Sequence, residues 1–305
     1  DFPPLLLPPP FLAVAIGAIY SSFQKILQMA FSFTKPFLHE ELPSCIIPTL
    51  VTTGGTATGD FEIDSTILFV HGGRFHQGDM HSHTDVAQKL ASLGHRVVRC
   101  TFPCGKDAPY ETGRTIELLA AVATMLQSEF GSSNIGLCGS SSGGFLAMKL
   151  CHRLPIFKFC LLLCPVANPA TRARYLSATI CEVGKSASVI EEEFLANGLH
   201  TKAKAEEILA GQSTFFSNGL AEMDSASFEL RSRPPMFPPT LVVLGRNDLN
   251  VPLAVVSDLI RWADRTIVVG GGHEIQDVIP SDENDYLTEL GMFIRRACRA
   301  KTEQK

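Results

Sequence analysis

Residues 135–147 read Ile-Gly-Leu-Cys-Gly-Ser-Ser-Ser-Gly-Gly-Phe-Leu-Ala and join a strand-like segment to a helix-like one. The first four residues of this stretch form a short apolar run that is typical of a buried strand, and its last residues begin a helical pattern. Between them Gly139, Ser141 and Gly143 fit Gly-x-Ser-x-Gly, in which the serine occupies a strained strand-to-helix turn. The glycines are needed because strand and helix pass too close there for side chains. We therefore expect Ser141 to be a nucleophile.

A glycine turn follows an earlier apolar run. His71-Gly72-Gly73 comes directly after residues 66–70, which read Thr-Ile-Leu-Phe-Val. Backbone amides on such a turn can converge with the amide of Ser142 and bind the oxyanion of a tetrahedral intermediate. The alternative is a plain β-turn, and in either case we expect His71 to be structural.

Two more candidate residues lie just past apolar runs. Asp248 follows residues 241–244, and His273 follows residues 266–269 and three glycines. The carboxyl ends of parallel strands are where α/β sheets place their sites. The chain order Ser, Asp, His matches a known arrangement of catalytic triads. We expect His273 to act as general base and Asp248 to orient it.

The rest of the chain alternates strand-like and helix-like segments. Strands are expected at 66–70, 96–102, 135–138, 157–164, 241–244 and 266–269, and helices at 112–130, 143–153, 253–265 and 282–299. Continuous apolar runs indicate strands buried on both faces. The sequence therefore predicts a doubly wound, mostly parallel sheet. About seventy residues without a strand precede Thr240, with helical patterns at 190–195 and 201–210, and they indicate a helical insertion or cap at about 166–239.

The composition of the chain indicates which kinds of partner and which cellular compartment to expect. The net charge of −5 comes without a basic block in the body of the chain, so a nucleic-acid partner is not expected. The basic group near the C-terminus is interpreted as the solvated end of a helix; its members are Arg295, Arg296, Arg299 and Lys301. The nine cysteines are scattered and odd in number, which favours reduced core thiols and an intracellular, reducing compartment.

The N-terminal region is apolar and differs from the rest. Three prolines end at Pro10, and the 21 residues that begin at Phe11 and end at Phe31 carry one charge, Lys25. Polar residues in the second half of this segment alternate with apolar ones at helical spacing. This pattern favours an amphipathic helix that lies on a membrane surface or on a protein partner. If the helix lies on a membrane, we expect the protein in an organelle. A helix packed on its own domain and a true span remain alternatives. We divide the chain into an extension over 1–42 and a catalytic domain over 43–305.

These motifs together resemble the α/β-hydrolase superfamily, in its esterase and lipase-like branch with a His-Gly-Gly loop. The resemblance runs from Ile46 to Arg299. It implies a Ser141–His273–Asp248 triad, an oxyanion hole lined by Gly72, Gly73 and Ser142, and a cap over the pocket. Two residues depart from the family pattern: Ser140 replaces a common histidine, and Arg74 replaces a third glycine of the loop, which leaves the choice of amide donors open.

The function expected from this resemblance is hydrolysis of a carboxylic ester, with an apolar or lipid-like small molecule as substrate. Thioesterase and amidase activity use the same triad and stay open. No cofactor or metal is expected. The polar cluster of His76, His81 and His83 with Asp79 and Asp85 is interpreted as a loop near the pocket mouth rather than a metal site. The alternative from another class is a non-catalytic scaffold subunit of a larger, membrane-associated assembly.

Overall fold

The fold is described from a computed structural model. The structure describes residues 31–39, 42–53, 65–102, 112–130, 134–183, 202–216, 219–228, 230–273 and 286–299. Most of the predicted helix between Phe11 and Phe31 lies outside these residues, as does the predicted helix over 190–195.

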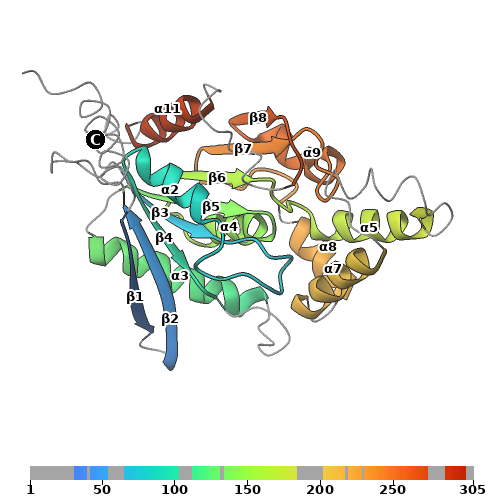
Figure 1. Ribbon diagram of the computed structural model, residues 1–305, viewed down its shortest axis with the longest axis horizontal. Coiled ribbons are helices and arrows are strands. Elements are labelled where there is room, and N and C mark those ends of the chain that lie inside the picture. Colours follow the sequence, from blue (N-terminus) through green and yellow to red (C-terminus); the bar gives the residue numbers. More distant parts are fainter. Residues whose placement is uncertain are drawn as a thin grey trace, which may run out of the picture.

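One sheet organises the molecule, with the strand order β1-β2-β4-β3-β5-β6-β7-β8 (Figure 1). The strands are β1 Phe31–His39, β2 Leu42–Thr53, β3 Ser65–Val70, β4 His95–Cys100, β5 Ile135–Ser140, β6 Phe159–Leu163, β7 Thr240–Gly245 and β8 Arg265–Val269. From β4 to β8 every neighbouring pair is parallel. The six strands predicted from apolar runs are all in this parallel part.

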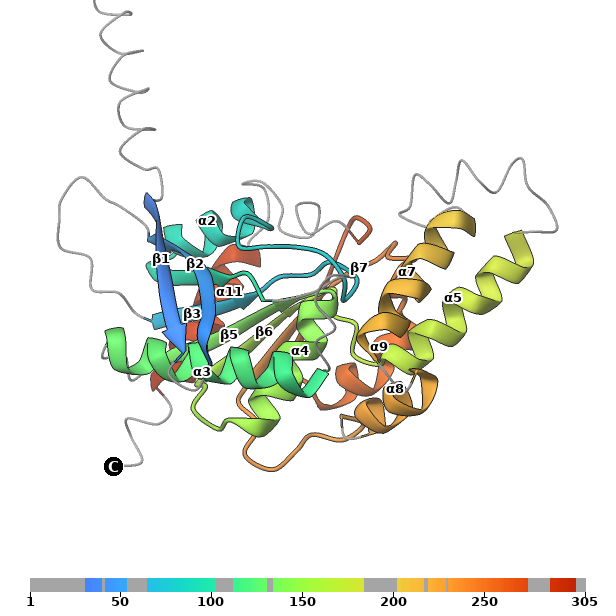
Figure 2. The same cartoon turned by 90° about the horizontal axis from the view of Figure 1, so that it is seen from below.

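Helices cover both faces of the sheet, as the buried runs require (Figures 1 and 2). On one face α3 Thr112–Phe130, α4 Ser142–Arg153 and α9 Leu253–Trp262 pack against side chains such as Leu68, Leu137 and Val242. On the other face α2 Thr84–Ser92 and α11 Tyr286–Arg299 pack against the alternate side chains, among them Ile67 and Val243. The fold is the predicted doubly wound α/β architecture.

Between β6 and β7 the chain forms a cap of helices. These are α5 Pro169–Val183, α7 Lys202–Phe215 and α8 Gly219–Phe228, which lie together at one end of the sheet, on the right in Figure 1. The cap is joined to the sheet side by the exit segment 230–239. There Trp262, at the end of α9, donates its indole N–H to the carbonyl oxygen of Leu230 at 3.2 Å and packs edge-on against Phe237.

Two antiparallel strands at the sheet edge were not predicted. β1 pairs with β2 from Phe31↔Thr53 to His39↔Leu42, so the pairing crosses the boundary that the sequence placed between 42 and 43. Phe31, expected at the end of a helix, instead begins β1. The division into an extension and a catalytic domain otherwise stays a prediction.

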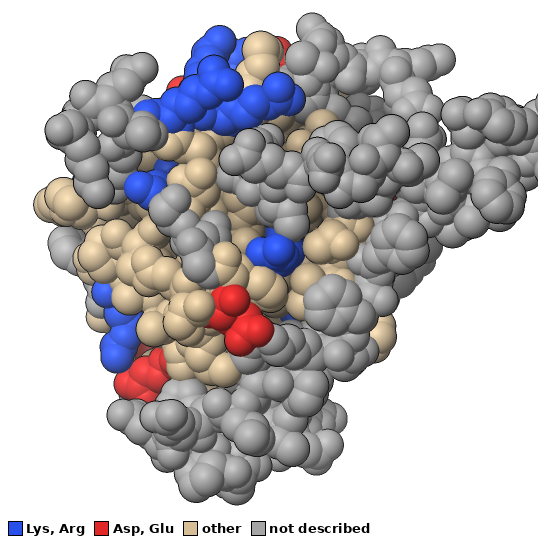
Figure 3. Space-filling view, turned by 90° about the vertical axis from the view of Figure 1, so that its left-hand side faces the viewer, with Lys and Arg blue, Asp and Glu red and all other residues tan. Residues whose placement is uncertain are grey.

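Arginines gather at the end of the last helix. Arg296 and Arg299 lie in the last turn of α11, and Figure 3 shows Lys and Arg side chains gathered at the top of the face it presents, where α11 lies. Arg265 of β8 pairs with Glu289 of α11 at 2.6 Å, which holds this helix to the sheet edge. In the part of the chain that the structure describes, no helix has the length and apolar content needed to cross a membrane.

Candidate active site

Ser141 occupies a sharp turn between β5 and α4. Its backbone has φ 50° and ψ −119°, a combination that non-glycine residues rarely adopt. A Cβ on Gly139 would lie 2.5 Å from the carbonyl oxygen of Gly143, and one on Gly143 would lie 2.3 Å from that of His71. Gly139 is therefore required by the close passage of β5 and α4, as the motif predicts, whereas Gly143 is required by the close approach of α4 to the end of β3.

A chain of hydrogen bonds joins the three predicted triad residues. The Ser141 hydroxyl lies 2.9 Å from Nε2 of His273, and Nδ1 of His273 lies 2.8 Å from Oδ2 of Asp248. Since a carboxylate only accepts, the ring proton sits on Nδ1, and Nε2 is left to accept the Ser141 proton. The arrangement can therefore activate Ser141 as a nucleophile.

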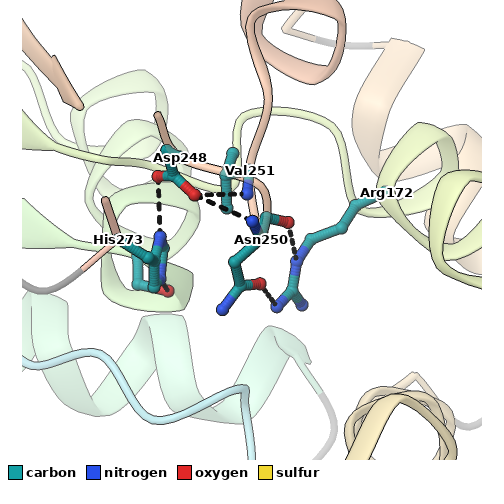
Figure 4. Close-up of polar contacts among 6 residues, drawn as sticks. Arg172, Asp248, Asn250, Val251 and His273 are labelled. Carbon is teal, nitrogen blue, oxygen red and sulfur yellow. Dashed lines mark hydrogen bonds and ion pairs between the residues drawn. The ribbon is translucent and has the colours of Figure 1, made fainter. Parts of the chain in front are cut away.

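Asp248 is held by its own loop and, through it, by the cap (Figure 4). Its Oδ1 accepts hydrogen bonds from the backbone N–H groups of Asn250 at 2.9 Å and Val251 at 2.8 Å. Arg172 of α5 is fully buried and donates to both the side-chain and backbone oxygens of Asn250. It also donates to Gln212 of α7 at 3.2 Å. Two cap helices are thus tied to the loop that carries the acid.

The thiol of Cys164 also lies against Asp248. Cys164 follows β6, is buried and has φ 43°. Burial, and secondly the charge of Asp248, raise the pKa of this thiol well above its ordinary value, and its sulfur lies within 4.8 Å of a carboxylate oxygen of Asp248. Buried free thiols recur elsewhere in the core, at Cys100, Cys138, Cys151 and Cys160.

The predicted oxyanion loop lies beside Ser141, since a Cβ built on Gly72 would be 3.1 Å from that of Ser141. The amide of Gly72, however, donates to Nε2 of His83 at 3.3 Å, which differs from its predicted role in the hole. Gly73 has φ 127°, and its amide and that of Ser142 have no acceptor within the described ranges. The amides of Gly73 and Ser142 therefore stay the predicted donors.

His83 is held neutral beside this loop. Burial, followed by the charges of His71, His273 and Arg99, lowers the pKa of His83 to about 4. The neutral ring can therefore accept the Gly72 amide at ordinary pH. Arg99 of β4 fixes the backbone around His83 by donating to the carbonyl oxygen of Ser82 at 3.1 Å and the hydroxyl of Thr84 at 2.7 Å.

His71 and His76 also lie near the oxyanion loop, and each has its own contacts. His71 is buried, stacks on Phe102 with ring centroids 4.1 Å apart, and donates from Nδ1 to the carbonyl oxygen of Gly72 at 2.6 Å. His76 lies 3.8 Å from Glu207 of α7, which also pairs with Arg74 at 3.5 Å. The expected polar loop thus reaches the cap through His76, and it reaches the backbone of the oxyanion loop through His83.

Aromatic rings fill the space between elbow, loop and cap. Phe75 of the oxyanion loop contacts Phe145 of α4, and both contact Phe216, the residue after the cap helix α7, with centroids 5.3 to 5.8 Å apart. All of these rings are buried. They are core side chains that fix the cap against the site.

Comparison with known proteins identifies the family. The model of a family described as having the α/β-hydrolase fold matches residues 67–254, more than half of the chain. The chain belongs to the α/β-hydrolase family. The matched residues include Gly72, Ser141 and Asp248, whereas His273 lies beyond them. A search of curated proteins found no match.

Solved structures agree with this α/β-hydrolase fold at low sequence identity. A bacterial brefeldin A esterase, a homologue of human hormone-sensitive lipase, has a TM-score of 0.64 at 15% identity, covering 98% of this chain and 89% of its own. An esterase from the archaeon Pyrobaculum calidifontis has 0.64 at 16%, covering 95% and 98%. A fungal esterase from Rhizomucor miehei has 0.66 at 14%, covering 98% and 94%.

Three residues of this α/β hydrolase's site had no signal in the motifs. Cys164 and Arg172 reach Asp248 and its loop from β6 and the cap. His83 was recognised only as part of a histidine-rich loop, and its contact with Gly72 depends on how that loop folds back. The one usable signal is that Cys164, like Asp248 and His273, comes just past a strand.

Proposed function

We propose that this chain is a serine hydrolase that cleaves carboxylic esters, with Ser141 as nucleophile, His273 as general base and Asp248 as the residue that orients it. The observation that carries the proposal is the unbroken hydrogen-bond chain from Ser141 through His273 to Asp248. The strained turn at Ser141 supports it, because such strain is typical of functional positions. The esterases among the similar folds favour esters over other acyl compounds.

In the proposed reaction Nε2 of His273 takes the hydroxyl proton while Ser141 Oγ attacks the ester carbonyl carbon. The amides of Gly73 and Ser142 donate to the oxyanion that forms, and losing one such donor typically costs about 10² to 10³ in rate. The bond to the alcohol then breaks, and His273 returns the proton to the leaving oxygen. Water attacks the acyl-enzyme by the same route and releases the acid.

The preference for apolar or lipid-like esters is a further part of this proposal. Its support is the apolar segment between Phe11 and Phe31, which suits attachment to a membrane surface or a protein partner. Phe145, Phe215 and Phe216 do not add to it, because they are buried in the core. Rates on esters of increasing acyl length, with matched thioesters and amides, would test the preference.

The decisive experiment is labelling with a fluorophosphonate probe, which reacts with an activated serine. We expect the adduct on Ser141, located by mass spectrometry, and its loss in Ser141→Ala. Ser128→Ala is a matched control, since Ser128 is an exposed serine on α3. Folded protein that takes up no label at Ser141 would contradict the proposal and favour a non-catalytic scaffold.

A further inference from the structure

Three adjacent strands end in side chains that can bind a metal ion together. β6, β7 and β8 are neighbours in the sheet, and just past them lie Cys164, Asp248 and His273. One donor atom from each, a thiol sulfur, a carboxylate oxygen and an imidazole nitrogen, lies within 4.8 Å of the other two. The proposed reaction uses the aspartate and the histidine but gives the thiol no task.

The chemistry of this donor set points to zinc. Zn²⁺ binds cysteine sulfur, histidine nitrogen and carboxylate oxygen, and it accepts mixed sets of them. A thiolate and a carboxylate together balance its charge, which favours the ion in a buried place. Mg²⁺ and Ca²⁺ prefer oxygen ligands and gain little from a thiolate.

We propose that Cys164, Asp248 and His273 form an inhibitory zinc site inside the triad. The metal binds Sγ of Cys164, the carboxylate of Asp248 and Nδ1 of His273. The inhibitory part rests on the proposed hydrolase function, whereas metal binding does not.

The proton balance explains why a bound ion stops the reaction. The thiol loses its proton to solvent when sulfur binds the metal. The imidazole stays neutral, but a metal on Nδ1 places the ring proton on Nε2. Nε2 then donates to Ser141 Oγ and can no longer take its proton. Zinc thus inactivates the base while leaving the nucleophile in place.

Little of the site is exposed to solvent. The side chain of His273 is 15% exposed and that of Asp248 3%, whereas Cys164 is fully buried. An ion therefore enters past His273, and we expect inhibition to develop during preincubation rather than at once.

Metal titration of the full chain tests the site without reference to activity. The probes are Zn²⁺, followed by calorimetry, and Co²⁺, whose bond to a thiolate gives a charge-transfer band in the near ultraviolet. The key variant is Cys164→Ser, which keeps a hydroxyl that can donate to Asp248 but removes the sulfur. Cys100→Ser is the matched control, since Cys100 is also a buried thiol at a strand end.

We expect wild type and Cys100→Ser to bind one tight zinc and to show the band. Cys164→Ser should lose the band and bind zinc about a hundredfold more weakly, since even partners outside the ligand set typically change affinity 10- to 100-fold. A band that persists in Cys164→Ser, or none in wild type, would overturn the proposal. Cys164→Ala, judged in the same way, decides the case if the serine variant does not fold.

Inhibition is read separately from binding. Zinc preincubation should slow fluorophosphonate labelling of wild type far more than that of Cys164→Ser, each protein being compared with its own labelling rate without zinc. Ser141→Ala should bind zinc like wild type, because Ser141 is no ligand. If neither wild type nor Cys164→Ser takes up the label, the proposed hydrolase function fails. The cobalt band still decides whether the zinc site exists. Labelling that zinc blocks equally in both proteins would overturn the inhibitory site.

Discussion

At the scale of single residues, the surroundings of Ser141 hold its backbone in a conformation that serine rarely adopts. Conformations of this kind cost about 1 to 3 kcal/mol and persist only where surroundings fix them. Here the Ser141 amide donates to the carbonyl oxygen of Leu163 at 2.9 Å, and its carbonyl oxygen accepts from Gly144 and Val166. Neighbouring strand, helix and loop therefore hold the hydroxyl where His273 can reach it.

Asp248→Asn should lower kcat by about 10⁴ with little effect on folding. The amides of Asn250 and Val251 would hold the new amide oxygen, which turns its NH₂ group toward Nδ1 of His273. The ring proton must then move to Nε2, where it blocks proton transfer from Ser141. Steady-state ester hydrolysis measures the effect.

The matched control for this substitution is Asp258→Asn. Asp258 lies on α9 in an exposed ion pair with Arg261, so its substitution should leave kcat unchanged. A near wild-type rate in Asp248→Asn would show that His273 needs no orienting carboxylate.

At the scale of elements, the cap is joined to the catalytic acid by Arg172. Its guanidinium bridges α5, α7 and the loop after β7 through Gln212 and Asn250. Burial lowers its pKa to about 10, so it stays charged at neutral pH. A charge buried in this way needs its hydrogen-bond acceptors. The cap and the acid loop therefore support each other.

Arg172→Met should lower both the free energy of unfolding and kcat, since it takes a charged donor away from buried acceptor groups of Asn250 and Gln212. Each such group costs about 1 to 3 kcal/mol. Denaturant unfolding and steady-state kinetics measure the two effects. The control is Arg174→Met on the same helix, where the arginine is half exposed and pairs with Asp224. Equal losses in the two variants would contradict a link specific to Arg172.

The elements differ in how far sequence predicts them. The parallel strands can be predicted from local sequence alone, because strands that are buried on both faces consist of continuous apolar runs. The sequences of β1 and β2 do not predict strands in this way, since Pro36 and Pro48 disfavour strands. The structure accommodates both: Pro36 lies on the edge strand, and Pro48 lies just before Thr49, where pairing with β4 begins.

In the candidate site, too, some features can be predicted from local sequence and others cannot. Ser141, Asp248 and His273 each follow a strand, so short motifs and chain order are enough to group them from the sequence alone. The amide donors could not be chosen in this way, because the Gly72 N–H is taken by a histidine eleven residues away. Contacts of that kind depend on how a loop folds back, and no local pattern encodes them.

At the scale of the whole molecule, buried histidines link stability to pH. Burial lowers the pKa of His71, and burial together with neighbouring charges lowers that of His83 from 6.5 to about 4. In the unfolded chain both titrate near their ordinary value. Between about pH 6.5 and pH 4 the unfolded state therefore binds more protons than the folded state.

The free energy of unfolding should accordingly be level just above pH 6.5, below the titration of the thiols, and fall as pH drops toward 4, with His83 contributing on the order of 3 kcal/mol. Denaturant unfolding across this range measures the slope. His83→Gln should flatten it, whereas His152→Gln, which changes an exposed histidine of α4, should not. A slope equal in wild type and His83→Gln would contradict the assignment.

The contact of Trp262 with the exit of the cap gives the molecule a built-in optical reporter. It is the single tryptophan of the sequence, so tryptophan emission excited selectively at the red edge of the absorption has one source. Its indole N–H and ring both contact the segment that leads from the cap to β7. A red shift of the Trp262 emission therefore indicates that this segment has separated from α9. Compared with circular dichroism of the whole chain, it distinguishes loosening at this junction from loss of the fold without any attached dye.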